Sequence, residues 1–125
     1  MNFWSFMFFV SLLIPVVMIV FGRMFMKSAP KGINGLFGYR TPMSMKNEDT
    51  WEFAHSYVGK LWFYGGIILL VITIIIMSAL VKKDAESLGN YDVMLVIAQV
   101  ICLAIPVFPT EKALKKNFDE QGNKR

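Results

Sequence analysis

The side chains that could do acid–base or metal chemistry lie in one stretch, residues 34 to 62, which holds the single histidine. His55 follows Glu52 by three residues, so on a helix the imidazole and the carboxylate could share one face. That spacing also occurs in metal-binding helix bundles, but a metal site needs at least one more ligand, and only scattered Asp and Glu residues are available. We expect a surface or interfacial histidine and neither metal nor cofactor, with a metal site at Glu52 and His55 as a weaker alternative.

Motifs for nucleophilic catalysis and for phosphate binding are missing from the sequence. No serine or cysteine stands in a nucleophile motif, and the glycines at 32, 35 and 38 are not followed by the Lys-Ser/Thr pair of a phosphate-binding loop. The one cysteine, Cys102, sits in an apolar run and has no second cysteine to pair with. We expect that the protein is not an enzyme.

Recognition is the chemistry that remains, and Arg40 is its best candidate. A guanidinium makes bidentate hydrogen bonds to a carboxylate or a phosphate. Gly38, Thr41 and Pro42 flank Arg40 and predict a turn that presents it. Two alternatives are open: Arg40 contacts a lipid phosphate, or it forms a structural salt bridge to one of the nearby acidic residues, Glu48, Asp49 or Glu52.

Aromatic side chains follow Arg40 on two faces of a predicted helix. The first face carries residues at spacings of four, three and four, namely Trp51, His55, Val58 and Trp62. The opposite face carries Phe53, Tyr57 and Tyr64. Rings on both faces suit a helix that crosses the headgroup zone or is wedged between neighbours. The alternative is that both rows simply lie on lipid or pack on the other spans.

The elements that must position these residues are apolar helices. Hydrophobic residues make up 55% of the 125 residues and the mean hydropathy is +0.50, which is too apolar for a soluble domain of this length. About 20 helical residues cross the hydrocarbon layer, and three uncharged runs approach or reach that length, at about 3–22, 62–81 and 93–110. The sequence predicts an all-α integral membrane protein: one membrane domain, residues 1–125, with three transmembrane helices, a motif-bearing connector at 23–61 and a polar tail at 111–125 that is largely disordered or weakly helical.

Helix boundaries follow from capping residues. Asn47 is a predicted N-cap, followed by acidic residues that oppose the helix dipole. The helix should run from about residue 48 to 81, roughly 50 Å, so the second span is extended by a cytoplasmic or interfacial segment. Asn90 with Asp92 predicts the start of the third helix, which leaves no ionisable residue in any span and argues against a proton-coupled exporter. Gln99, near the middle of the third span, should face another helix.

The orientation follows from the positive residues. Six Lys or Arg lie in the first connector, five in the tail and two in the loop between the second and third spans. Placing the connector and the tail in the cytoplasm puts eleven positive residues inside and two outside. We predict a multi-pass protein of the cell (inner) membrane with its N-terminus outside and its C-terminus cytoplasmic. The net charge of +4 reflects these topology signals, so we expect no direct nucleic-acid partner.

The stretch NGLFGYRTPMSMKNEDTWEFAHSYVGKL resembles the SdpI family of bacterial membrane proteins, whose namesake is an immunity protein. The residues that carry the resemblance are Gly38, Arg40, Thr41, Pro42, Trp51, His55 and Gly59. The resemblance implies protection against a secreted, membrane-active toxic peptide, in some cases with capture of a transcriptional regulator at the membrane. It makes these residues, with Asn34 and Asn47, the candidate partner-binding site.

The residues alone leave a second function open. The protein could be a non-catalytic membrane scaffold that binds lipid headgroups or a cytosolic partner through Arg40 and the aromatic helix. In either case the lipid bilayer is a partner. A homo-oligomer is expected, because three helices with a mid-span amide and several glycines have a limited core of their own.

Overall fold

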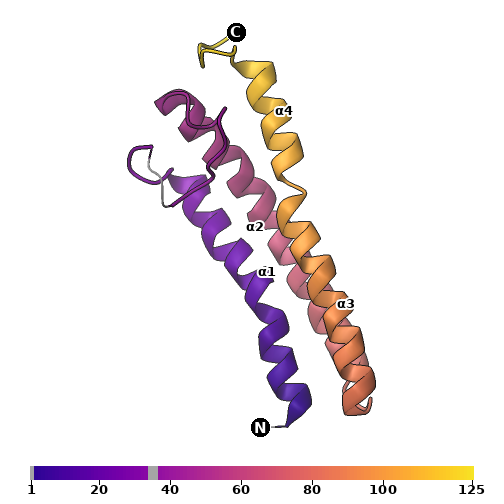
Figure 1. Ribbon diagram of the computed structural model, residues 1–125. Helices are drawn as coiled ribbons and strands as arrows, with labels where there is room; N and C mark the ends of the chain where they lie inside the picture. Colours follow the sequence, from indigo (N-terminus) through magenta and orange to yellow (C-terminus); the bar gives the residue numbers. More distant parts are fainter. Residues whose placement is uncertain (1, 34–36) are drawn as a thin grey trace.

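The computed structural model describes residues 2–33 and 37–125, and its regular elements are four α-helices. Helix α1 runs over Phe3–Lys27, α2 over Glu48–Ala79, α3 over Ala85–Ala104 and α4 over Val107–Asn117. Figure 1 shows α1, α2 and α3 as long helices packed lengthwise, with α4 continuing the line of α3. The described residues form no strand, only an isolated bridge between Phe118 and Lys124.

Three helical segments are long and apolar enough to cross a membrane: α1, α2, and the run Ala85–Asn117 that joins α3 to α4. Large apolar side chains stand exposed along all three, as at Phe9, Ile75 and Met94, where a lipid-facing surface requires them. The prediction of an all-α membrane protein with three spanning helices is therefore confirmed.

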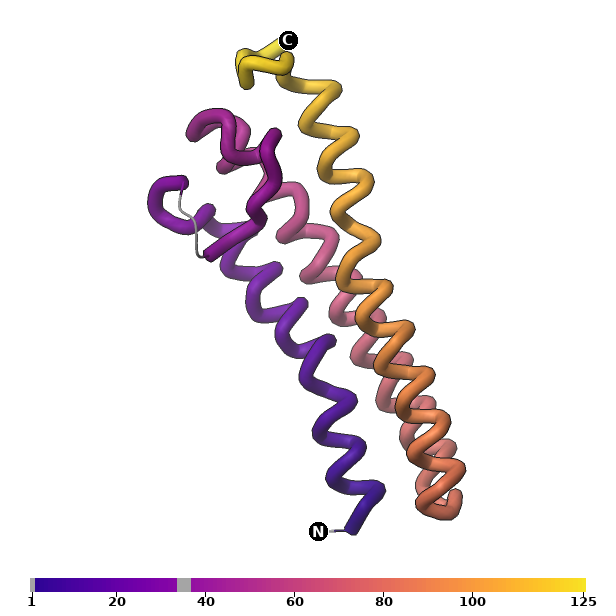
Figure 2. The backbone as a smooth tube through the Cα atoms, viewed as in Figure 1, coloured from indigo at the N-terminus to yellow at the C-terminus, as the bar shows by residue number. Residues whose placement is uncertain are grey.

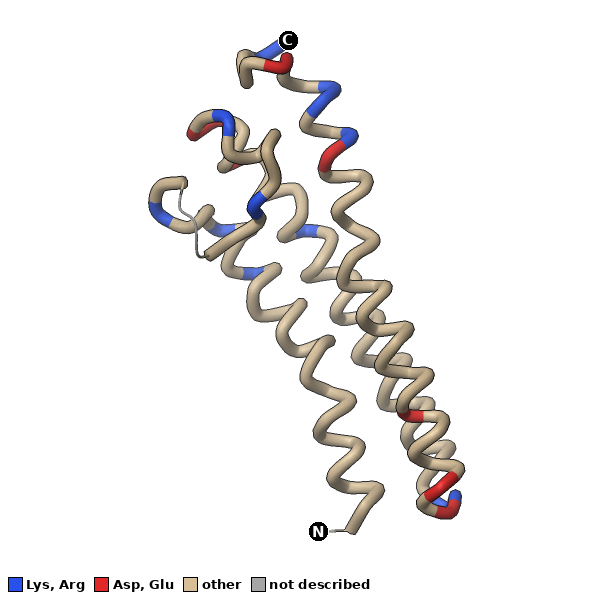
Figure 3. The backbone as a smooth tube through the Cα atoms, in the orientation of Figure 1, with Lys and Arg blue, Asp and Glu red and all other residues tan. Residues whose placement is uncertain are grey.

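The two ends of the bundle differ in content. Figure 2 shows the N-terminus and the α2–α3 loop at one end, and the connector and the C-terminus at the other. Lys and Arg gather at the connector end, while a smaller group lies at the α2–α3 loop (Figure 3). We call these the connector end and the loop end of the bundle.

Helix α2 begins as the sequence predicts. The Asn47 side chain accepts a hydrogen bond from the Thr50 backbone N–H (2.9 Å), and the Thr50 hydroxyl accepts one from the Asn47 N–H (3.0 Å), a reciprocal capping box. Glu48 and Asp49 occupy the first turn. At about 1.5 Å per residue, the 32 residues of α2 extend about 48 Å, longer than the hydrocarbon layer.

Helices α1 and α2 touch through their glycines. A Cβ atom added at Gly59 would lie 2.8 Å from the Gly22 carbonyl oxygen and 2.8 Å from the Met26 backbone nitrogen. A Cβ at Gly66 would lie 2.9 Å from Ile19 Cγ1. Small residues let membrane helices approach backbone to backbone, so Gly59 serves the α1–α2 crossing.

Helix α3 begins earlier than the sequence suggested. Asp84 is the N-cap, and its carboxylate accepts from the Ser87 N–H (3.4 Å). Hydrogen bonding by the side chain and the backbone of Ser87 lowers the pKa of the exposed Asp84 carboxyl. Asn90 and Asp92 therefore lie inside the helix and do not start it. With Asp84 as the N-cap, only a few residues separate α2 from α3. The third helix therefore begins almost two turns earlier in the sequence than Asn90 would place it.

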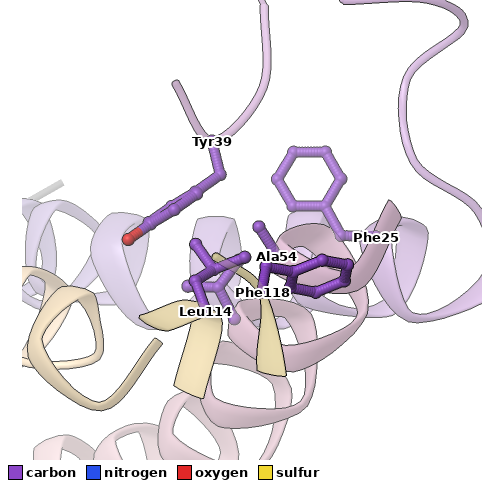
Figure 4. Close-up of a cluster of buried hydrophobic side chains, with 6 residues drawn as sticks. Phe25, Tyr39, Ala54, Leu114 and Phe118 are labelled. Carbon is purple, nitrogen blue, oxygen red and sulfur yellow. The ribbon is translucent and has the colours of Figure 1, made fainter. Parts of the chain in front are cut away.

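The C-terminal residues are folded, contrary to the prediction of a disordered or weakly helical tail. Helix α3 ends before Pro106, and α4 continues to Asn117. Arg125 then folds back, its Nε donating to the Lys115 and Phe118 carbonyl oxygens at 2.9 Å. Figure 4 shows the reason: Leu114 and Phe118 pack on Ala54 of α2. These two buried side chains stabilise the segment through tertiary packing, although most of its residues are polar.

Candidate functional site

The residues that follow the undescribed stretch, 37 to 46, form a turn that lies on the first turns of α2. We call it the connector turn. Gly38 adopts a φ of +116°, and a Cβ there would lie 2.7 Å from His55 Nε2 and 3.1 Å from the Trp51 ring. Only glycine fits both the backbone conformation and the space. The backbone of the connector turn is therefore pressed directly on α2.

His55 of α2 holds the connector turn through a hydrogen bond. The Tyr39 backbone N–H donates to His55 Nε2 (2.8 Å), and His55 Nδ1 lies 2.7 Å from the Trp51 carbonyl oxygen. A ring nitrogen that accepts from an N–H carries no proton, so Nδ1 is the protonated donor and the imidazole is neutral. The side chain is fully buried. The expectation of a surface or interfacial histidine is therefore wrong. The buried imidazole is the hydrogen-bond acceptor for the backbone N–H of Tyr39.

The arrangement around His55 leaves no ring nitrogen free for a metal. Both nitrogens are in hydrogen bonds, and Glu52 is exposed on the helix. In the part of the chain that the structure describes, no group of three or more His, Cys, Asp or Glu side chains could hold a metal ion.

Ser44 and Thr41 close the connector turn on itself. The Ser44 hydroxyl donates to the Tyr39 carbonyl (3.0 Å) and accepts from the Thr41 N–H (2.9 Å). The Thr50 hydroxyl of α2 donates to the Ser44 carbonyl (3.0 Å). Ser44 and Thr50 are fully buried. Buried polar groups that are all satisfied give a segment one conformation, so the connector turn is a built element.

Glu111 ties the connector turn to α4. Both the Tyr39 and Thr41 hydroxyls donate to Glu111 Oε2, at 2.6 and 2.9 Å. Burial, with the adjacent Glu111 carboxyl, holds the pKa of Tyr39 far above its usual value, so the phenol stays a donor. Neither Tyr39 nor Glu111 was among the predicted site residues. The pairing joins residues 72 positions apart, and no local pattern encodes it.

The predicted aromatic faces divide between core and surface. Trp51, His55 and Val58 are fully buried, and the Trp51 indole N–H donates to the Pro30 carbonyl (2.9 Å). Trp62 donates to the Leu103 carbonyl of α3 (3.1 Å). The first face therefore packs inside the protein, which was the alternative left open by the sequence. Tyr64, on the second face, is 58% exposed.

Arg40 stands apart from this network. Its side chain is exposed, and it makes no hydrogen bond or ion pair with any residue that the structure describes, including the three acidic residues considered as partners. Pro42 beside it is also exposed. The connector turn thus holds its hydroxyl groups inward and turns the Arg40 guanidinium outward, free to bind a carboxylate or phosphate.

An apolar groove of about 310 Å³ opens beside the connector turn. It reaches from Gly38 past Trp62 to Leu103, across α1, α2 and α3. The remaining lining side chains are apolar: Val17, Met18, Phe21, Phe25 and Phe37. The groove offers a site for an apolar segment next to Arg40's turn.

A family model described as the SdpI/YfhL protein family matches residues 31–110, a range that contains the connector turn, all of α2 and all of α3. The chain belongs to this family. It is also similar to the protein described as "Uncharacterized protein YfhL" of Bacillus subtilis (strain 168), with 28% identity over 109 residues, which covers 87% of this chain and 89% of that one. No solved structure gives a significant match.

The residues that carry the SdpI/YfhL resemblance fall into two groups, those that build the fold and those that point outward. Gly38, Trp51 and His55 meet in one contact, and Thr41 joins them through Ser44. Asn47 caps α2 and also donates from Nδ2 to the Gly122 carbonyl (2.7 Å), whereas Gly59 lies at the α1–α2 crossing. Arg40 and Pro42 point outward, and Asn34 lies outside the described residues. Most of the motif builds the connector turn, and Arg40 is what it presents.

Sequence reasoning missed a second polar site in this SdpI/YfhL chain. Because α3 begins at Ala85, Asp92 lies within a span, and the expectation of no ionisable residue there is wrong. The Ser11 hydroxyl of α1 donates to Asp92 Oδ1, and Gln99 Nε2 donates to the Ser11 carbonyl (2.8 Å) and to Thr73 Oγ1 (2.9 Å). The prediction that Gln99 faces another helix is confirmed. A signal was present: the buried residues of α3 recur at four, three and four, as Leu88, Asp92, Leu95 and Gln99.

Proposed function

We propose that this SdpI/YfhL protein is a non-catalytic membrane protein that protects its cell against a membrane-active toxic peptide, with Arg40 as the recognition residue. One observation carries the proposal: Arg40 is exposed and unpaired within the described chain, on a turn whose hydroxyl groups are bound inward. A rigid turn that presents one guanidinium loses little entropy on binding. The family resemblance supplies the class of partner.

The groove beside the connector turn suits the apolar part of such a peptide. Its lining is apolar and lies among the spanning helices, so a peptide could enter it from the bilayer. Arg40 would then pair with a carboxylate of the peptide at the membrane surface. The excess of positive residues favours a cytoplasmic connector end and an outside N-terminus. A peptide that crosses the bilayer interior would meet the connector turn from within the membrane.

A survival assay tests the proposal. Cells sensitive to a membrane-active peptide would express the wild type, Arg40→Ala or Lys46→Ala. The Lys46 variant is the control, because it removes an exposed positive charge at the last residue of the same turn. We expect Arg40→Ala to lose protection and Lys46→Ala to keep it, at equal accumulation in the membrane. A charged hydrogen-bonded pair contributes about 1.5–3 kcal/mol, so affinity should fall roughly 10- to 150-fold.

The outcome that would overturn the proposal is full protection by Arg40→Ala, or no protection by the wild type across a broad panel of such peptides. Trp51→Ala is not a useful probe of recognition. Its indole is fully buried and bonded to Pro30, so the substitution tests the fold.

A second candidate function is capture of a partner at the inner face. Helix α4 adds three exposed lysines to the connector end, Lys112, Lys115 and Lys116. With Arg40 they would make a basic surface suited to anionic headgroups or an acidic regulator. A cytosolic protein that copurifies only when Arg40 is intact, without any resistance phenotype, would favour this function over immunity.

A further inference from the structure

A polar seam crosses the apolar part of the bundle near the loop end, where α1, α2 and α3 meet. Ser11, Thr73, Asp92 and Gln99 are each at most 2% exposed. Ser11 lies eight residues into the uncharged run 3–22, about 12 Å from its start at about 1.5 Å per residue. The seam is therefore set well inside the span.

Asp92 has no opposite charge facing it. Its partner is the Ser11 hydroxyl of α1. Neither the run 3–22 of α1 nor residues 61–79 of α2, the helices packed against α3, contains Asp, Glu, Lys, Arg or His. On α3 itself the next charged residue is Glu86, exposed in the first turn. Leu88 and Leu95 flank Asp92 on its own face and belong to a buried apolar cluster. A lone carboxylate in such surroundings is costly, and ionisable groups kept inside spans usually have a function.

Gln99 supplies a second, independent observation. Its Oε1 is the only buried side-chain nitrogen or oxygen among the described residues without a hydrogen-bond partner. The same amide is held by the Ser11 carbonyl, and the same serine's hydroxyl holds Asp92, so the two side chains converge on Ser11. A buried acceptor without a partner needs a donor, which a water molecule would supply.

We propose that Asp92 is an intramembrane proton-binding site in a polar seam, where Gln99, held by the same serine, lies on the side of Asp92 away from the loop end and its Oε1 accepts from a water molecule. One proton neutralises one carboxylate, which matches a site with a single ionisable group. A divalent metal would keep an excess charge here. The site lies eight residues from Asp84 at the loop end, so water at that end is the nearest source of the proton. This inference does not depend on the immunity function.

Labelling of the full-length protein by dicyclohexylcarbodiimide tests the site, because this apolar reagent adds to protonated carboxyl groups inside membranes. We expect peptide mass mapping of the protein in lipid vesicles to find the adduct on Asp92, at a yield that rises as the pH falls. Asp92→Asn should lose that adduct. Glu86→Gln, which removes the exposed carboxyl of the same helix, should leave the Asp92 adduct unchanged.

Ser11→Ala tests whether the seam serves the Asp92 carboxyl group. The Ser11 hydroxyl donates to Asp92, so its loss should change the yield of the Asp92 adduct at a fixed pH. Absence of the Asp92 adduct in folded wild type at every pH from mildly acidic to mildly alkaline would overturn the proposal. Protection of Asp92 by sodium ions at constant pH would also overturn it, in favour of a sodium site.

Discussion

The connector turn and the intramembrane seam are two polar regions with opposite degrees of satisfaction. At the connector turn, Tyr39, Thr41 and Ser44 are each bonded to α2, α4 or one another. At the seam, Gln99 keeps an acceptor without a partner, and Ser11 links its amide to an intramembrane carboxyl group. The connector turn lies at the end rich in positive residues, and the seam lies among apolar side chains near the other end.

The difference separates polar groups that hold a fold from polar groups that are available for exchange. A buried network in which every polar group is hydrogen-bonded specifies one conformation. A buried polar group without a partner costs folding free energy, so its presence calls for an explanation. The connector turn therefore explains how Arg40 is presented. The seam is expected to contribute little to stability, and its polar side chains call for a functional explanation.

Gly38→Ala should have the largest effect, because it breaks the connector turn and leaves the seam intact. Backbone strain at a positive φ costs about 1 to 3 kcal/mol, and the added Cβ would also lie 2.7 Å from His55 Nε2. We expect the connector to become sensitive to trypsin at Arg40 and Lys46. The unfolding free energy should fall by more than the backbone strain alone, because the contact adds to it. Limited proteolysis and unfolding in detergent measure both.

Gly32→Ala is the matched control. Gly32 also has a positive φ, +67°, but a Cβ there would meet no atom within 4 Å. It should cost only backbone strain, which is smaller at +67° than at +116°, so the difference between the two variants combines the contacts with His55 and Trp51 with the added strain at Gly38. Equal effects of the two variants would mean that the connector turn does not depend on its fit against α2.

Glu111→Gln should have the next largest effect, since it weakens the link between the connector turn and α4. Hydrogen bonds to a charged acceptor contribute about 1.5–3 kcal/mol, against about 0.5–1.5 kcal/mol for neutral ones, so a loss of about 1 to 3 kcal/mol is expected. The pKa of Tyr39 should fall toward its usual value, because burial would still raise it but the negative charge of Glu111 would not. Chemical unfolding and spectrophotometric titration measure these changes.

Glu120→Gln removes an exposed carboxyl near the same end and is the control for net charge. It should leave both the stability and the Tyr39 titration unchanged. A Glu111→Gln variant that behaves like this control would show that the connector turn is held by α2 alone.

Local signals in the sequence were sufficient for the helices. Asn47 and the acidic residues after it predict the start of α2, because capping acts within one turn. The amide of Gln99 predicts a helix–helix contact, since an isolated amide in a span is costly. The three spans follow from uninterrupted apolar runs, which no soluble fold would expose.

Long-range pairings could not be predicted from the sequence. Glu111 looked like the start of a solvated tail, yet it accepts from two hydroxyls of the connector turn. Phe118 lies in a polar segment but packs on α2. The sequence predicts a helix start at Asp92, because a charged residue usually marks the end of a span. Its position on the buried face of α3 is decided by Ser11, which lies 81 residues away.

Gln99→Leu should have the smallest effect on stability and gives the sharpest test of the contrast. Hydrogen bonds between membrane helices average about 0.6 kcal/mol, and leucine removes a buried acceptor that has no partner. The expected change in unfolding free energy is therefore close to zero, measured against Met94→Leu on the exposed side of the same helix. A loss of about 2 kcal/mol or more, as at the connector turn, would mean that the seam is structural. An unchanged stability combined with altered carbodiimide labelling of Asp92 would show that Gln99 is kept for the site and not for the fold.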